Sequence, residues 1–328
     1  MKPAFEIDIS VGAQSALPAH GFLELVELSR TFHTKRNLRP PLGIYNVSVA
    51  RVLHKVTTLC SKLEPYVQSF GPRDTKPDIG QTMNEDVIDY IELTLYAASE
   101  HIDDLKLIVD NFYPTDVESR KCKAHKKFNE DIKVLKSFIA KLTNHIKHAQ
   151  HRIRLYGIGF THGGSSGTLH GYFVESAEGG VVGPSSVFHA HGSNVFSITS
   201  LAWEVLCFLL QSSASLKIFL ESKPLLNGPA KTSSEAFQKA VIAAARLPLY
   251  TFDDPHPFEK CTLKLAGDET SSVAMSSGIY GSIFNRWRDD PYPEFGSSAV
   301  AFSGDGVSRS FRIVSPSKVG LQHWQPPA

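Results

Sequence analysis

The sequence predicts an α+β protein, with an N-terminal all-helical antiparallel bundle followed by a mixed module of hairpins, a buried helix and C-terminal antiparallel strands. Apolar residues recur at helical spacing in long segments up to about residue 154, and turn residues separate short strand-like runs after it. A composition of 42% hydrophobic and 20% charged residues fits a soluble chain that buries a core. The change in pattern predicts two domains, a helical module over 1–154 and an α+β module over 155–328.

Three long helices are predicted in the first module. The first covers 44–70 and ends before Gly71-Pro72. The second covers about 84–113, where Pro114 stops it, and the third covers about 117–154. The loops that join them predict an antiparallel bundle.

Shorter elements are predicted in the second module. Strands over 155–160 and 171–175 flank a Gly-rich turn and form a hairpin. The apolar stretch 195–220 contains charged residues and is too short in its densest part to cross a bilayer, so we expect a core helix and no membrane segment. A helix over 233–246 follows, and four further strands are expected, at 260–265, 273–275, 298–302 and 308–314.

Cysteine usage and the first residues of the chain bear on the compartment. Cys60, Cys122, Cys207 and Cys261 lie far apart and form no C-x-x-C pair, which favours a reducing cytosol over a disulfide scaffold. No apolar leader is visible near the start. No acidic residue or cysteine is spaced to complete a histidine metal set, so we expect a cytoplasmic protein with no cofactor and no metal site.

The charge is distributed unevenly along the helical module. Residues 120–154 carry eleven Lys and Arg against two acids, whereas residues 85–118 carry ten acids against one lysine. One interpretation is that the basic helix is an anion-binding surface, most plausibly for RNA phosphates. The other is that the two helices pack together and neutralise each other, with each exposed pair contributing about 0–1 kcal/mol.

Histidines are concentrated in the same region and beyond it. Eight of the fourteen lie between His125 and His191. At 100° per residue, Asn144, Lys147, His148 and His151 fall on one side of the third helix, opposite its apolar face. Imidazole serves as a general acid or base near neutral pH, which is the chemistry that a metal-independent ribonuclease requires.

Three long helices with Asn144-His145-Ile146-Lys147-His148 near the end of the third resemble the HEPN superfamily. The resemblance covers at most residues 44–154 and implies a helical module of the kind found in dimeric RNases of toxin and phage-defence systems. The family's signature is Arg, four to six residues, then His, and it matches here at Arg120 to His125. This match departs from the family pattern, because it lies at the start of the third helix and lacks the polar residue that often follows the Arg.

These observations predict a cytosolic RNA-binding or phosphate-binding protein of HEPN-like type, and within that class a metal-independent ribonuclease. In a nuclease, His148 or His151 would be the acid or base, Lys147 or Arg152 would hold the phosphate, and Asn144 would orient it. Nucleic-acid contacts are expected from four further cations, Lys126, Lys133, Lys141 and Arg154. We expect a homo-oligomer. The alternative is a non-enzymatic interaction or structural protein whose basic helix docks on its own second domain or on a partner subunit.

Overall fold

The computed structural model describes residues 17–68, 81–162, 165–178, 181–189, 195–226, 228, 234–247 and 250–251, together with five short strands and an N-terminal one. The helices are α1 (His20–Glu24), the 3₁₀ turn η1 (Leu28–Arg30), α2 (Pro41–Gln68), α3 (Gln81–Asp110), α4 (Asp116–Lys121), α5 (Lys123–His148), α6 (Ser200–Glu221) and α7 (Glu235–Ala245). The strands are β1 (Phe5–Asp8), β2 (Arg152–His162), β3 (Ser165–Glu178), β4 (Val181–Pro184), β5 (Phe196–Ser197), β6 (Tyr250–Thr251), β7 (Leu263–Ala266), β8 (Glu294–Phe295), β9 (Ala299–Phe302), β10 (Arg309–Arg312) and β11 (Gly320–Leu321).

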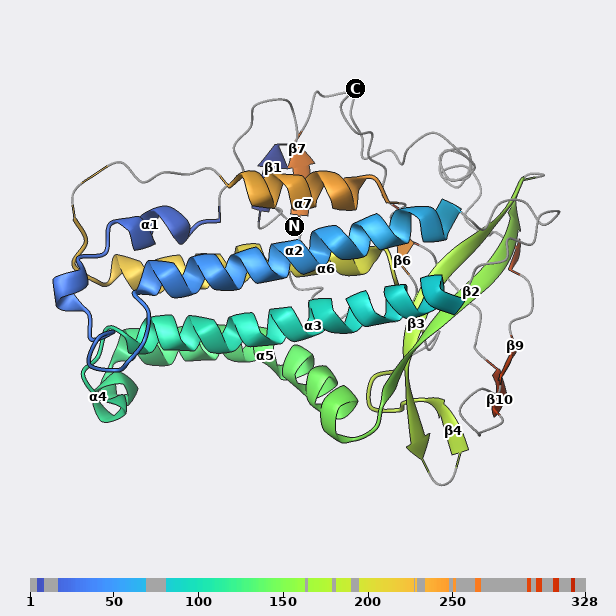
Figure 1. Ribbon diagram of the computed structural model, residues 1–328, viewed down its shortest axis with the longest axis horizontal. Helices are drawn as coiled ribbons and strands as arrows, with labels where there is room; N and C mark the ends of the chain where they lie inside the picture. The colour runs from blue at the N-terminus through green and yellow to red at the C-terminus, as the bar shows by residue number, and fades with distance from the viewer. Residues whose placement is uncertain are drawn as a thin grey trace.

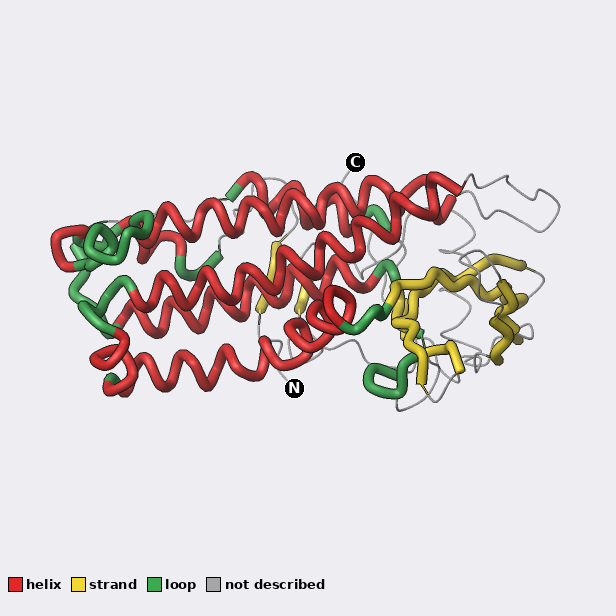
Figure 2. The backbone as a smooth tube through the Cα atoms, turned by 60° about the horizontal axis from the view of Figure 1, so that its bottom comes forward, coloured by secondary structure: helices red, strands yellow, loops and turns green. Residues whose placement is uncertain are grey.

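Four long helices, α2, α3, α5 and α6, form the body of the protein, and α7 lies along α2 (Figure 1). The hairpin of β2 and β3 stands at one end of this bundle, beside the end of α2 and the beginning of α3 (Figures 1 and 2). The predicted α+β class is therefore confirmed, with an antiparallel sheet that follows the first helices.

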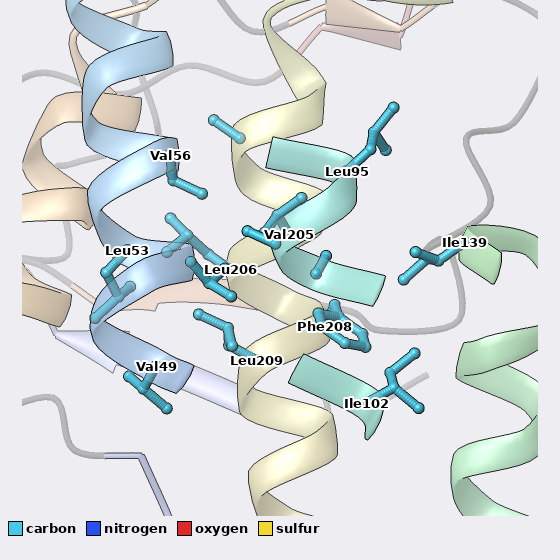
Figure 3. Close-up of a cluster of buried hydrophobic side chains, with 14 of the residues drawn as sticks. Val49, Leu53, Val56, Leu95, Ile102, Ile139, Val205, Leu206, Phe208 and Leu209 are labelled. Carbon is cyan, nitrogen blue, oxygen red and sulfur yellow. The ribbon is translucent and has the colours of Figure 1, made fainter. Parts of the chain in front are cut away.

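The core lies between α6 and the three helices that precede it. Figure 3 shows Val49, Leu53 and Val56 of α2 turned toward α6, and Ile139 of α5 on the other side, beside α3. Fully burying one such aliphatic side chain contributes about 1.5–3 kcal/mol. Residues from both sides of the expected boundary at 154 thus share one core cluster, so that position marks a change in secondary structure rather than a break between two cores.

The apolar helix α6 was expected to be a core helix. It is the one described helix that is long and apolar enough to cross a membrane, with a mean hydropathy of 1.3, yet 67% of that apolar window is buried inside the protein. Such burial is typical of a core helix in a soluble protein.

The main sheet has the strand order β4-β3-β2-β8, and β5 pairs with β3. β2 and β3 pair antiparallel from Arg152–Glu175 to His162–Ser165, which makes both strands longer than predicted. β9 pairs with β10 and β6 with β11, both antiparallel, whereas β1 and β7 are parallel. The predicted strands near 260, 298 and 308 are found as β7, β9 and β10; the one at 273–275 lies outside the described residues.

The third predicted helix is wrong in two respects. It is broken at Cys122, whose backbone is extended (φ −75°, ψ 129°), so that α4 and α5 are separate helices. It also ends at His148 and not near residue 154, because Gln150 takes a left-handed conformation (φ 57°) and turns the chain into β2. Arg152 and Arg154 therefore lie on a strand. The alternation of polar and apolar residues over 152–155 was the signal for it.

A polar network is buried where α2, α3 and α6 meet. The His101 ring lies between two hydroxyls, with Nδ1 2.8 Å from Ser48 Oγ and Nε2 3.3 Å from Ser212 Oγ. Next to it, the Tyr45 hydroxyl and Ser213 Oγ are 2.7 Å apart. Burial in this site lowers the pKa of His101 to about 3, and the charge of Arg51 lowers it further in the same direction.

Candidate nucleic-acid interface

The helix α5 is amphipathic and packs against α3 and α6. Its inner face carries buried apolar residues spaced three or four apart, as in a helix that covers a core: Phe128, Ile132, Leu135, Ile139, Leu142 and Ile146. The opposite face is free to carry charge, and this is where the lysines lie.

The outer face of α5 carries a row of five exposed lysines, which we call the lysine row: Lys123, Lys126, Lys133, Lys141 and Lys147. The row extends for about 36 Å along the helix, from the 1.5 Å rise per residue. Among the residues that the structure describes, none of the five has an acidic partner within ion-pair distance. Glu130 is an exposed acid on the same face. Lys126, Lys133 and Lys141, predicted from the sequence to contact nucleic acid, are thus at the surface.

Three of the eight acids of α3 pair with cations of α2. Arg51 bonds both Glu100 and Asp104, the latter at 2.7 Å. Lys62 likewise pairs with Asp86 at 2.6 Å.

Between α3 and α5, the described part of the chain contains one lysine–carboxylate pair, Lys136 to Asp103 at 3.2 Å. This lysine lies outside the lysine row. One interpretation of the sequence was that α3 and α5 neutralise each other. This pair does so in part, but it leaves the lysine row without acidic partners among the described residues.

Near the end of α5, Asn144, Lys147 and His148 are all exposed. The Lys147 ammonium lies 4.4 Å from the centre of the Tyr96 ring on α3, a cation–π contact. These three predicted site residues therefore lie together on the outer face, and a tyrosine that sequence reasoning missed lies beside them.

His151 does not join them, which corrects the predicted stripe. It is buried (8% exposed), with Nδ1 3.1 Å from the Ala149 carbonyl oxygen and Nε2 3.3 Å from Ser185 Oγ. Its ring packs edge-on against His145 at 4.6 Å, and Phe188 lies against both rings. The wheel placed His151 outside because it assumed a helix that in fact ends three residues earlier.

The neighbouring imidazole of His145 is shifted away from its charged form. Burial lowers the pKa of His145, and the His151 ring and the Lys141 ammonium lower it further. The His145–His151 pair is thus a packed junction between α5 and the segment that follows β4, not an exposed acid–base pair.

The two predicted arginines have different surroundings on β2. Arg152 is exposed and donates to the His151 carbonyl oxygen at 3.1 Å. Arg154 is half-buried and donates from Nε and Nη2 to one carboxylate oxygen of Glu175, at 3.2 and 3.0 Å. Because the Glu175 side chain is only 5% exposed, Arg154 balances a buried charge.

A stripe of four α3 residues lies beside Lys147 and Arg152, and sequence reasoning missed it. Asn84, Ile88, Glu92 and Tyr96 are four residues apart and therefore lie on one face of the helix. Burial raises the pKa of Glu92, and the charge of Arg152 opposes that rise. The four-residue spacing was visible in the sequence, but which strand would face it was not.

We found no protein family, no characterised protein and no solved structure that matches this chain. Within the described ranges, no three His, Cys, Asp or Glu side chains gather closely enough to hold a metal ion. What the protein does is therefore inferred from the arrangement of its own residues.

Proposed function

We propose that this protein is a cytoplasmic RNA-binding protein that holds the phosphates of a single strand along the lysine row. The observation that supports this is the row itself, which is five exposed ammonium groups on one helix face without described acidic partners. In the neighbouring helix α3, three acids pair with α2. The net charge of the chain is only +1, so attraction for phosphate would come from this pattern and not from overall charge.

Binding is better supported than catalysis. Cleavage of RNA without a metal needs one group to take the 2′-OH proton and another to protonate the leaving oxygen. His148 is exposed beside Asn144 and Lys147, whereas His151 is buried among structural partners. A HEPN-like ribonuclease of a defence or toxin-type system stays a prediction, in which His148 is the proton-transfer group.

The test compares two variants of equal charge change. In the first, Lys126, Lys133 and Lys141 are replaced by Glu. In the control, Lys55, Lys217 and Lys239 are replaced by Glu; these lysines lie on α2, α6 and α7. Binding of a fluorescein-labelled single-stranded RNA of mixed sequence is followed by anisotropy between 50 and 300 mM salt.

For a single strand, each phosphate contact contributes about 0.7 to the slope of log K against log salt. Losing three contacts should therefore make the slope shallower by about 2 and weaken binding about 100-fold at 0.1 M salt. The control should bind like the wild-type protein. Equal weakening in both variants would overturn the proposal. Because ammonium–phosphate contacts do not distinguish RNA from DNA, a DNA strand of the same sequence that binds equally well would leave the lysine row as the site and overturn RNA as its specific partner.

The interaction-protein alternative predicts a different result from the same variants. If the lysine row is a subunit interface, sedimentation should show a wild-type dimer that the first variant loses, with no RNA binding by either. That outcome would replace RNA by a second copy of the chain as the partner of α5.

A further inference from the structure

A cavity of about 330 Å³ lies where the end of α2, the start of α3 and strand β2 meet. Its described lining consists of Tyr66, Asn84, Ile88 and the β2 residues Arg154, Leu155, Tyr156 and Gly157. The volume is at the lower end of the range of about 300–1,000 Å³ typical of small-molecule sites. The cavity thus has room for one compact group.

The stripe on α3 reaches from the proposed RNA surface to the cavity. Tyr96, at one end of the stripe, contacts Lys147 of the lysine row. Asn84 and Ile88, at the other end, line the cavity. Asn84 and Tyr96 are twelve positions apart, which corresponds to about 18 Å of helix. Lys147, Arg152 and Arg154 therefore lead from the lysine row to the cavity.

The charge balance inside the cavity disfavours a second phosphate. The guanidinium of Arg154 lies against the carboxylate of Glu175, so the pair has no net charge. Burial raises the pKa of Tyr66 to about 12, which keeps its hydroxyl neutral. An uncharged ligand is favoured in such surroundings.

The side chains of the lining fit a nucleobase. Tyr66, Tyr156 and Leu155 contribute aromatic and apolar atoms to the lining, although both tyrosines are only 4% exposed. A lining of this kind can hold the flat apolar surface of a base. Asn84 and Arg154 carry amide and guanidinium groups, which are the groups that bond the polar edges of bases.

We propose that this cavity receives one unstacked base of the RNA strand whose phosphates lie on the lysine row. The inference rests on the proposed function. It adds a pocket that distinguishes a base from bare backbone, which the lysine row alone does not do.

The experiment uses two ligands of equal charge: a single-stranded RNA oligonucleotide and the same ribose-phosphate backbone with its bases removed. Each is titrated into the wild-type protein, Ile88→Trp, which fills the cavity, and Asn84→Ala, which removes an edge contact. Thermal unfolding checks that both variants fold. Stacking of one base is worth about 1–3 kcal/mol, which is about 5- to 150-fold in affinity.

We expect the wild-type protein to prefer the RNA over the base-free backbone, and Ile88→Trp to lose about 5- to 150-fold of that preference. Asn84→Ala should lose part of this preference. If Ile88→Trp does not fold, Asn84→Ala alone decides the test. Both variants should bind the base-free backbone as the wild-type protein does. The same preference for bases in all three proteins would overturn the base pocket.

The two proposals fail in different ways. If the lysine substitutions leave RNA binding unchanged, the proposed function is wrong. If they weaken it but filling the cavity does not reduce the preference for bases, the proposed function stands and the base pocket is wrong. Free adenosine and ribose 5-phosphate, followed by saturation-transfer NMR, are a further check: adenosine should give a signal that Ile88→Trp abolishes, and a signal from ribose 5-phosphate alone would instead indicate a phosphate site.

Discussion

Lowering the pH from 7 to 5 should destabilise the protein through the buried imidazole of His101. This side chain has no exposed surface, and its two ring nitrogens contact the hydroxyls of Ser48 and Ser212. Its pKa is about 3 in the folded protein, against an ordinary value of 6.5. The unfolded chain therefore binds a proton before the folded protein does, so stability falls as the pH drops below about 6.5 and continues to fall until about 3.

The size of the effect follows from these two values. Below the ordinary pKa, the imidazole is protonated in the unfolded chain but not in the folded protein, so each pH unit lowers the free energy of unfolding by about 1.4 kcal/mol. Between pH 7 and pH 5, His101 alone should remove about 2 kcal/mol from the free energy of unfolding. His170, whose pKa burial also lowers to about 3, should remove a similar amount.

Urea unfolding at both pH values measures this loss, and His101→Gln isolates one part of it because glutamine is polar but does not titrate. The wild-type protein should lose about 2 kcal/mol more than the variant over this range. NMR of the His101 ring gives a second measurement that needs no substitution, since its Cε1–H signal should not move between pH 8 and pH 5. An equal loss in both proteins, or a ring that titrates near 6.5, would refute the argument.

Two further predictions concern single side chains. A hydrogen bond from Tyr113 lowers the pKa of Cys122, whereas burial raises that of Cys60 to about 12. Iodoacetamide at pH 7.5 should therefore alkylate Cys122 before Cys60, as peptide mass spectrometry would detect, and equal rates at the two would contradict this. Replacing Arg154 by Met leaves the buried Glu175 carboxylate without this partner and should lower the free energy of unfolding by about 2–3 kcal/mol, measured in urea; a change below about 0.5 kcal/mol would show that the pair is not structural.

Helical periodicity carried most of the fold prediction. The buried positions of α2 and α3 follow the spacing seen in the sequence, because a regular element repeats its inward face. The break at Cys122 and the turn at Gln150 were not predicted, since neither position carries the Gly or Pro that usually ends a helix. The backbone conformations at these two positions depend on tertiary packing of the segment that follows each of them.

In the candidate site, too, the positions of side chains around one helix could be predicted, whereas the end of that helix could not. The position of the lysine row around α5 is a property of one helix, so a wheel places Lys126 and Lys133 correctly. His151 was misplaced because its orientation depends on where the helix ends.

Which helix neutralises α3 is a property of the whole bundle, and it decides whether the lysine row has charge to offer. Two acidic side chains of α3 turn to Arg51 and a third to Lys62, and both cations belong to α2. A carboxylate already paired on one side offers little to a lysine more distant on the other, because the Coulomb attraction is screened within about 10 Å at the surface. The surplus on α5 is thus fixed by a contact that α5 does not make.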